Sequence, residues 1–260
     1  MHIINLSAAG IRTDLISEQK KKRKNIKTRK EKDILIKEAL DFKNRTTTIY
    51  FKDITDSNHY KEVETVFIQE LKKYLHLSKK DQFLIVGLGN RKSTPDSLGP
   101  TTISHILVTR YLYSLGEVEE GYTSVATFSP DVTGNTGIET LDIVDSIIRK
   151  IDVNKIIIID ALKTNHLERL GKTIQITNSG ISPGSGIGNT RKEITKKTLK
   201  KEIIVIGVPT VIDLSKGKTS SNYMVTPTNI DFLIEKISLL LGKGINISLH
   251  KNFIRQNNTE

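Results

Sequence analysis

Two aspartates, each following a run of apolar residues, are the side chains in this sequence best suited to catalysis. Asp96 comes after a glycine-rich turn that follows the apolar run 83–86, and Asp160 ends the run of four isoleucines at 156–159. Two carboxyl groups that share a crevice cannot both ionise cheaply, so one of them keeps a proton. Such a pair can activate a water molecule and then protonate a leaving amine.

The patterns around these aspartates predict how the chain brings them together. Short apolar runs such as 83–86 and 156–159 are typical of strands buried on both faces of a parallel sheet. Sites in such sheets lie at the carboxyl ends of the strands, so we expect Asp96 and Asp160 to share one edge of the sheet. Each aspartate also has a structural alternative. Asp96 could cap the helix that follows it, and Asp160 could accept hydrogen bonds from loop amides.

Two glycine-containing loops are expected to support the aspartates. The turn after the apolar run 83–86 is expected to bring two backbone segments close together or to contain a residue with a positive φ, both of which glycine tolerates. A second stretch, 178–189, is rich in Gly, Ser and Pro, and we interpret it as a functional loop within the domain. The supporting residues in these two loops are Gly87, Gly89, Asn90, Gly184 and Gly186.

The rest of the sequence alternates short apolar runs with segments of helical periodicity. Strands are expected at 48–52, 83–88, 123–128, 155–159, 173–177 and 203–208. Helices are expected at 31–42, 60–75, 101–115, 138–151 and 228–241. This alternation predicts an α/β fold with a mostly parallel sheet and helices on both faces.

Composition excludes several classes of protein. The chain has 260 residues and no cysteine, which rules out a disulfide framework, a cysteine nucleophile and a thiolate zinc site. No apolar run is long enough to cross a bilayer and no secretory leader is evident, so we expect a cytoplasmic protein without a membrane partner. The glycine-rich turn lacks the third glycine of a dinucleotide-binding motif, and no P-loop occurs.

The formal net charge of +11 is concentrated near the amino terminus. Residues 19–33 contain nine basic and two acidic side chains, so this segment carries +7 of the total. A charge block of this kind is most often a solvated arm, and no aromatic residues are interleaved here for base stacking. The alternative is that the run from Lys20 to Lys32 binds DNA or speeds encounter with a DNA-bound partner.

Several motifs together resemble the germination proteases, the endopeptidases that degrade small acid-soluble spore proteins when a spore germinates. In chain order the similar blocks are 94–100 (Thr-Pro-Asp-Ser-Leu-Gly-Pro), 160–162 (Asp-Ala-Leu), 180–189, 206–213 and 224–231. The resemblance places the family's proposed catalytic aspartates on Asp96 and Asp160, in an atypical aspartic peptidase. It also implies a fold similar to that of the hydrogenase-maturation endopeptidases.

The resemblance further implies a zymogen that processes itself. Residues 13–18 are similar to the family's propeptide junction and to the sequence its members cut, which places cleavage between Asp14 and Leu15. The expected organisation is a propeptide at 1–14, a basic and mobile segment at 15–46, and one α/β peptidase domain at 47–260. The implied substrates are small acid-soluble spore proteins, the implied assembly is a homotetramer, and the implied location is the cytoplasm of the spore core.

Two other functions are left open by the sequence. The maturation endopeptidases use acidic residues at corresponding motif positions as metal ligands, so a metal-dependent endopeptidase of the same fold is one alternative. The six histidines show no strong metal-ligand spacing, so we expect no cofactor while leaving the metal open. The other alternative is a basic DNA-associated binding protein without catalytic activity. A pure binding protein would have no need of both Asp96 and Asp160.

Overall fold

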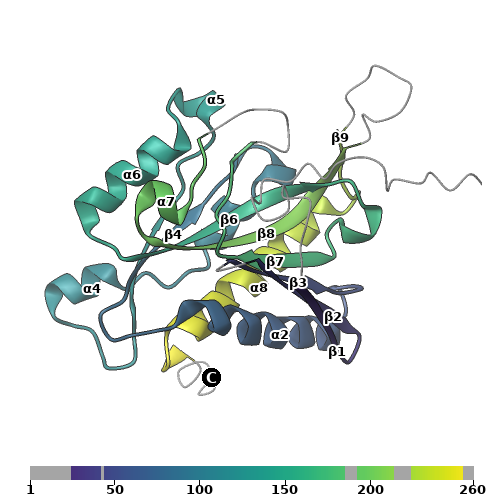
Figure 1. The fold of residues 1–260 in the computed structure, drawn as a ribbon, viewed down its shortest axis with the longest axis horizontal. Coiled ribbons are helices and arrows are strands. Elements are labelled where there is room, and N and C mark those ends of the chain that lie inside the picture. The colour runs from purple at the N-terminus through teal and green to yellow at the C-terminus, as the bar shows by residue number, and fades with distance from the viewer. Residues whose placement is uncertain (1–24, 42–43, 185–191, 214–223, 254–260) are drawn as a thin grey trace, which may run out of the picture.

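The structure, a computed structural model, describes residues 25–41, 44–184, 192–213 and 224–253. Its strands form a single sheet in the order β1-β2-β3-β7-β8-β6-β4-β5, with β9 paired to β8 (Figure 1). The strands are β1 (Asn25–Glu31), β2 (Ile34–Asp41), β3 (Asn44–Tyr50), β4 (Gln82–Gly87), β5 (Ser124–Phe128), β6 (Lys155–Thr164), β7 (Thr173–Thr177), β8 (Glu202–Asp213) and β9 (Met224–Val225).

The sheet has a parallel half and an antiparallel half. Strands β8, β6, β4 and β5 are mutually parallel, as the sequence predicts for the strands that carry the two aspartates. Strands β1, β2, β3 and β7 continue the sheet in antiparallel pairs, and β7 joins the parallel half by an antiparallel pairing with β8. The carboxyl ends of β4 and β6 therefore lie side by side in the parallel half, where a crevice is expected.

Helices cover both faces of the sheet, which confirms the expected α/β architecture (Figure 1). The sheet is mixed and not mostly parallel as expected, because five of the eight pairings among the described strands are antiparallel. The helices are α2 (Ser57–Leu75), α3 (Leu98–Ile103), α4 (Arg110–Leu115), α5 (Thr133–Thr136), α6 (Thr140–Ile151), α7 (Lys196–Leu199) and α8 (Ile230–Leu249), with single 3-10 turns η2 (Thr94–Asp96) and η3 (Leu167–Arg169). Figure 1 shows α2 and α8 on one face and α6 and α7 on the other. None of the described helices is long and apolar enough to cross a membrane.

The four isoleucines of β6 explain why the sheet is buried on both faces. Ile157 and Ile159 belong to the apolar core that includes side chains of α2 and α8. Ile156 and Ile158 belong to a second core, which includes side chains of α6. Because side chains alternate between the faces of a strand, an uninterrupted apolar run is needed to fill both cores.

The helix expected at 31–42 is wrong, because this segment forms a β-hairpin. Strands β1 and β2 pair in antiparallel register, and Lys32 in the turn between them has a φ of 51°. Ile34 and Ile36 are each 1% exposed, while Lys37 is exposed to solvent. From Ile34 to Lys37, burial thus follows the two-residue period of a strand, even though the segment contains good helix formers. Residues 25–41, assigned to a basic segment ahead of the domain, are therefore part of its sheet.

Acidic side chains offset part of the basic run within this hairpin. Arg29 forms ion pairs with Glu31 and Glu70, and Lys32 Nζ lies 2.6 Å from Glu62 Oε1. Glu70 is fully buried on α2, so its pair with Arg29 joins β1 to that helix. The positive charge of residues 25–32 is thus partly compensated within the domain. Residues 20–24 of the same run lie outside the described residues.

The helix expected at 101–115 is interrupted in the structure. Helix α3 ends at Ile103 and α4 begins at Arg110. The backbone of the segment between these helices binds the side-chain amide of Asn246 on α8. Leu107 N–H donates a hydrogen bond to this amide, and the amide donates one to the His105 carbonyl, each at 2.9 Å. These bonds from α8 satisfy backbone groups that a continuous helix would pair internally. Strands β6 and β8 and helix α8 all extend beyond their expected ends.

A buried ion pair holds the start of β6 against the end of α2. The Lys155 ammonium donates hydrogen bonds to the carbonyls of Leu75 and His76 at 2.7 and 2.8 Å, and to Asp81 Oδ2 at 2.8 Å. Lys155 and Asp81 are 7% and 6% exposed. Burial opposes ionisation of Asp81, but the hydrogen bonds from Lys155 and Ser78 hold its pKa below the ordinary value. The lysine also satisfies carbonyls at the carboxyl end of α2.

We predict that Lys155→Met lowers the free energy of unfolding by about 3 kcal/mol, because it leaves Asp81 as an unpaired buried charge. Urea unfolding followed by circular dichroism measures this change. The double variant Lys155→Met with Asp81→Asn is the control, and it should recover part of the loss because no buried charge is left. A single variant as stable as the wild type would contradict the proposed importance of the pair.

Candidate active site

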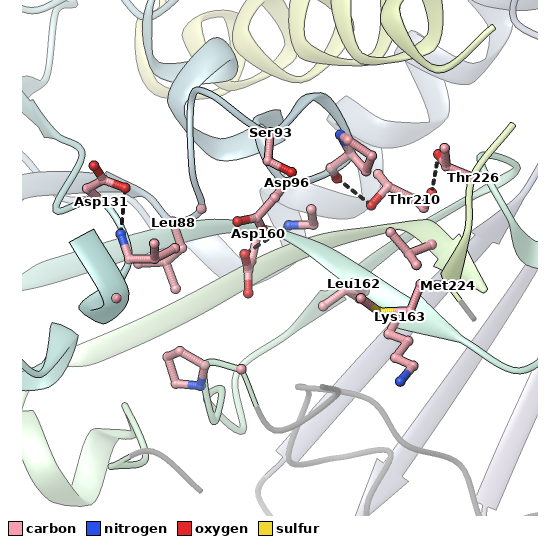
Figure 2. A pocket seen from close by; sticks show the side chains of 18 of the residues that line it. Leu88, Ser93, Asp96, Asp131, Asp160, Leu162, Lys163, Thr210, Met224 and Thr226 are labelled. Atoms are coloured by element: carbon pink, nitrogen blue, oxygen red, sulfur yellow. Dashed lines mark hydrogen bonds between the residues drawn. The ribbon is translucent and has the colours of Figure 1, made fainter. Parts of the chain in front are cut away.

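A pocket of about 560 Å³ lies at the carboxyl ends of the parallel strands. Asp96 and Asp160 both line this pocket, so the structure brings together the two aspartates that the sequence singled out (Figure 2). They come from different elements, since Asp96 ends the 3-10 turn η2 and Asp160 lies within β6. The arrangement arises because β4 and β6 are parallel, so the segments beyond their paired residues lie at one edge of the sheet.

Asp96 is positioned by backbone hydrogen bonds on both sides. Its Oδ2 accepts a hydrogen bond from Asn90 N–H at 2.9 Å, and its own N–H donates to the Ser93 carbonyl at 2.8 Å. The neighbouring Pro95 carbonyl accepts a hydrogen bond from Thr210 Oγ1 at 2.6 Å, which ties η2 to β8. The residue at the N-cap of α3 is Ser97, so Asp96 does not occupy the capping position that was its structural alternative.

Glycines allow the turn after β4 to pack directly against the segment that carries Asp96. Gly89 has a φ of 115°, and a Cβ at this position would lie 1.9 Å from the Asp96 carbonyl oxygen. A Cβ at Gly87 would lie 2.4 Å from the carbonyl oxygen of Gly99. A Cβ at Gly99 would in turn meet the carbonyl of Ile159 at 2.6 Å. Each contact is with backbone, which cannot move aside as a flexible side chain could.

Asp160 lies one residue beyond the end of the β4–β6 pairing. The pairing ends with Gly87 opposite Ile159, and Leu88 N–H donates to the Ile159 carbonyl at 2.8 Å. The Asp160 side chain is 5% exposed, and its Oδ1 accepts a hydrogen bond from the N–H of Ala161 at 2.9 Å. Asp160 thus binds an amide of its own strand, rather than the loop amides of the structural alternative, and lines the pocket.

The supporting residues differ in their relation to the pocket. Gly89 and Gly184 line the pocket. Gly87 and Asn90 do not line it: Gly87 allows close packing against Gly99, and the Asn90 N–H binds the Asp96 carboxylate. Three of the residues named from the sequence lie outside the described residues, namely Gly186, Asp14 and Leu15.

Sequence reasoning missed Asp131, a third aspartate of the pocket. Asp131 has a φ of 64°, which is uncommon for a residue other than glycine. Its Oδ1 accepts hydrogen bonds from Val132 N–H at 2.7 Å and from Asn135 Nδ2 at 2.9 Å. The signal was available, because Asp131 follows the expected strand 123–128 much as Asp160 follows its isoleucines. Gly99 was missed too, since nothing local indicates its close approach to β6.

The far side of the pocket from Asp131 is partly apolar and partly cationic. Figure 2 shows Leu162, Lys163 and Met224 on this side, with Asp96 and Asp160 between them and Asp131. Met224 and Val225 of β9 are 57% and 43% exposed, whereas Lys163 is 8% exposed. The pocket therefore has walls of different chemistry on either side of the two aspartates.

A metal site built from several protein ligands is not evident in the described part of the chain. There, no group of three or more His, Cys, Asp or Glu side chains is arranged to hold a metal ion. The aspartates of the pocket therefore do not form a three-ligand set of the kind that catalytic zinc sites use. Carboxyl groups line the described part of the pocket together with the Lys163 ammonium and several hydroxyl side chains.

The close backbone contacts predict that Gly89→Ala is strongly destabilising. The new Cβ would collide with the Asp96 carbonyl and would require a φ that alanine disfavours, so we expect a loss of about 2 kcal/mol or more in unfolding free energy. Gly116→Ala is the matched control, because Gly116 also has a positive φ, of 73°, but nothing lies within 4 Å of its added Cβ. Thermal unfolding of both variants compares a glycine packed against backbone with a positive-φ glycine that has open space beside it. Equal losses in the two variants would mean that the contact with Asp96 is unimportant.

Known proteins similar to this chain point to one family. The family model of the germination proteases matches residues 8–220. The germination protease of Geobacillus sp. (strain WCH70) is 42% identical over 188 residues, which cover 70% of this chain and 48% of that protein. The germination protease of Bacillus mycoides (strain KBAB4) is 43% identical over 194 residues, which cover 73% of this chain and 51% of that protein. The chain thus spans about half the length of the curated relatives it matches.

Two solved structures also align with this fold, at low sequence identity. A NiFe hydrogenase maturation protease, HycI from Thermococcus kodakarensis KOD1, aligns with a TM-score of 0.39 and 14% identity, over 68% of this chain and 98% of that one. A hydrogenase 3 maturation protease aligns with a TM-score of 0.32 and 13% identity, over 62% of this chain and 89% of that one. The sequence matches, and not these alignments, establish that this chain belongs to the germination protease family.

Proposed function

We propose that this protein is an endopeptidase that starts the degradation of small acid-soluble spore proteins during spore germination. The observation that carries the proposal is the pocket shared by Asp96 and Asp160 at the carboxyl ends of the parallel strands. Membership of the germination protease family supports the substrate class and the setting in the spore core. The homotetramer remains a proposal that rests on the family resemblance alone.

The two carboxyl groups supply the acid and the base that peptide hydrolysis needs. One ionised aspartate accepts a proton from a water molecule as that water attacks the scissile carbonyl. The other aspartate, which holds the proton shared by the pair, gives it to the leaving amine. The Asn90 and Ala161 amides each donate a hydrogen bond to one carboxylate, so both side chains are held in place for this exchange.

Neither alternative function gains a specific supporting observation. A metal-dependent endopeptidase would need further ligands, and the described residues contain no three-ligand group. A DNA-binding role for the basic run is weakened where the run is described, because Arg29 and Lys32 are paired with glutamates. A chelator included in the assay decides the first alternative, since only a metal-dependent enzyme loses activity that added metal restores.

We predict that Asp96→Asn and Asp160→Asn each lower kcat/KM by about 100- to 10,000-fold while leaving thermal unfolding nearly unchanged. Each substitution removes one member of the acid–base pair but keeps the shape of the side chain. The double variant should lose little more than either single variant, because the two residues act as a unit. The assay is cleavage of a purified small acid-soluble spore protein, followed by mass spectrometry.

The matched control is Asp145→Asn, an aspartate of α6 whose carboxylate forms an ion pair with Arg149 on the same helix. This variant should cleave the substrate at the wild-type rate. Wild-type activity in either pocket variant would remove that aspartate from the proposed mechanism.

We also propose that the chain is made as a zymogen and cuts itself between Asp14 and Leu15. Under activating conditions, intact mass measurement should reveal a shortened chain that begins at Leu15. The reaction should depend on both pocket aspartates, so Asp96→Asn protein should keep its full length under the same conditions. A shortened product in that variant would instead indicate an outside protease, and a full-length active enzyme would argue against the zymogen.

A further inference from the structure

Asp131 combines a place in the pocket with a backbone conformation that is uncommon for its residue type. Five described residues other than glycine have a positive φ. Lys32 lies in the turn of the β1–β2 hairpin. His76, Asp152 and Lys200 are the C-caps of α2, α6 and α7, where such a conformation is ordinary. Asp131, with a φ of 64°, has neither position, so the structure holds an aspartate in the pocket where glycine would be less strained.

The hydrogen bonds of Asp131 within the protein do not need its charge. One carboxylate oxygen, Oδ1, accepts both bonds that hold the side chain, from Val132 N–H and from Asn135 Nδ2. The amide oxygen of an asparagine could accept the same two bonds. In the described part of the chain, no basic side chain forms an ion pair with this carboxylate. The contacts that fix the loop therefore leave the negative charge and the second oxygen, Oδ2, unused.

Charge is distributed unevenly across the pocket. Figure 2 shows Asp131 on one side of Asp96 and Asp160, and Lys163 on the other side. A positively charged group is therefore attracted to the side of Asp131. The pocket residues that follow Asp131 in the chain carry no charge, and they are Val132, Thr133 and Gly134. A basic side chain that enters this side of the pocket would thus find its partner in Asp131.

We propose that Asp131 is a specificity-determining residue, whose carboxylate binds a lysine or arginine side chain of the polypeptide substrate near the bond that is cut. The ammonium or guanidinium group donates hydrogen bonds to Oδ2, and hydrogen bonds between opposite charges are stronger than those between neutral groups. The inference rests on the proposed endopeptidase function and deepens it by naming a substrate side chain that the pocket selects.

The expected processing sequence contains a basic residue at a suitable distance from the bond that is cut. Arg12 is the third residue on the amino side of the bond between Asp14 and Leu15, and it is the basic residue nearest to that bond. An extended chain covers about 10 Å in three residues, which is comparable with the width of a pocket of about 560 Å³. A peptide with the sequence of residues 10–19 is therefore a suitable probe.

The test is a double-mutant cycle between this peptide and the protein. The peptide is used with its natural sequence and with Arg12→Gln, and the protein is used as wild type and as Asp131→Asn. Asparagine tolerates a positive φ and keeps the oxygen that accepts both hydrogen bonds, so Asp131→Asn should unfold at nearly the wild-type temperature. The readouts are kcat/KM for each combination, and Kd for the same combinations in proteins that also carry Asp96→Asn, so that binding is measured without cleavage.

We expect Asp131→Asn to lower kcat/KM and affinity for the natural peptide about 10-fold, because a hydrogen bond between opposite charges is lost. For the Arg12→Gln peptide, the same substitution should change both values less than about 2-fold, since that peptide has no cation for Asp131 to bind. Asp152→Asn is the matched control, because Asp152 is also an aspartate with a positive φ, of 46°, but does not line the pocket. This variant should prefer the natural peptide as strongly as the wild type does.

An equal preference between the two peptides in wild-type and Asp131→Asn protein would overturn the inference, even if both peptides are cleaved. Coupling between Arg12 and Asp131 in Kd, without cleavage of the natural peptide, would support the inference and contradict the proposed function. A natural peptide that neither binds nor is cleaved would overturn the inference. Cleavage of a small acid-soluble spore protein by the same preparation would then show that the proposed function still holds.

Discussion

The geometry of the site depends on backbone packed directly against backbone. The turn after β4 lies so close to the segment from η2 to α3 that a single Cβ at Gly87, Gly89 or Gly99 would fall within 2.4 Å of a carbonyl oxygen. This contact keeps η2 beside the end of β6, and Asp96 therefore shares a pocket with Asp160. Side chains at these glycines would push the two segments apart, and Asp96 and Asp160 would no longer share the pocket.

The rest of the domain supports this contact from both sides. Helix α8 lies against α3, and its Asn246 amide binds the backbone of the segment between α3 and α4. The Thr210 hydroxyl of β8 donates a hydrogen bond to the Pro95 carbonyl and so holds η2 against β8. At the opposite end of β6, Lys155 pairs with Asp81, and its bonds to the Leu75 and His76 carbonyls join the strand to the end of α2. The strand that carries Asp160 is thus held at its start by an ion pair and along its length by two apolar cores.

The antiparallel half of the sheet has a different role from the parallel half. The described pocket residues from strands belong to β6, β8 and β9, and the hairpin β1–β2 contributes none of them. The hairpin instead buries Ile34 and Ile36 in the core that includes α2, and Arg29 pairs with Glu70 of that helix. A basic segment near the amino terminus is thereby built into the domain. Because Arg29 and Lys32 of this segment form ion pairs with glutamates, less positive charge is available to bind nucleic acid than the sequence alone would indicate.

Local patterns in the sequence were enough to locate Asp96 and Asp160. Apolar runs that end in a turn or a carboxylate are local features, and the parallel strands they indicate bring their ends to one edge. The hairpin at 25–41, the break between α3 and α4 and the close contact of Gly99 became visible only in the tertiary structure. Each of these depends on partners distant in sequence, such as Glu70, Asn246 or the Ile159 carbonyl. Periodicity and propensity describe neighbours along the chain, whereas strand pairing and backbone contact are decided by which distant segments pack together.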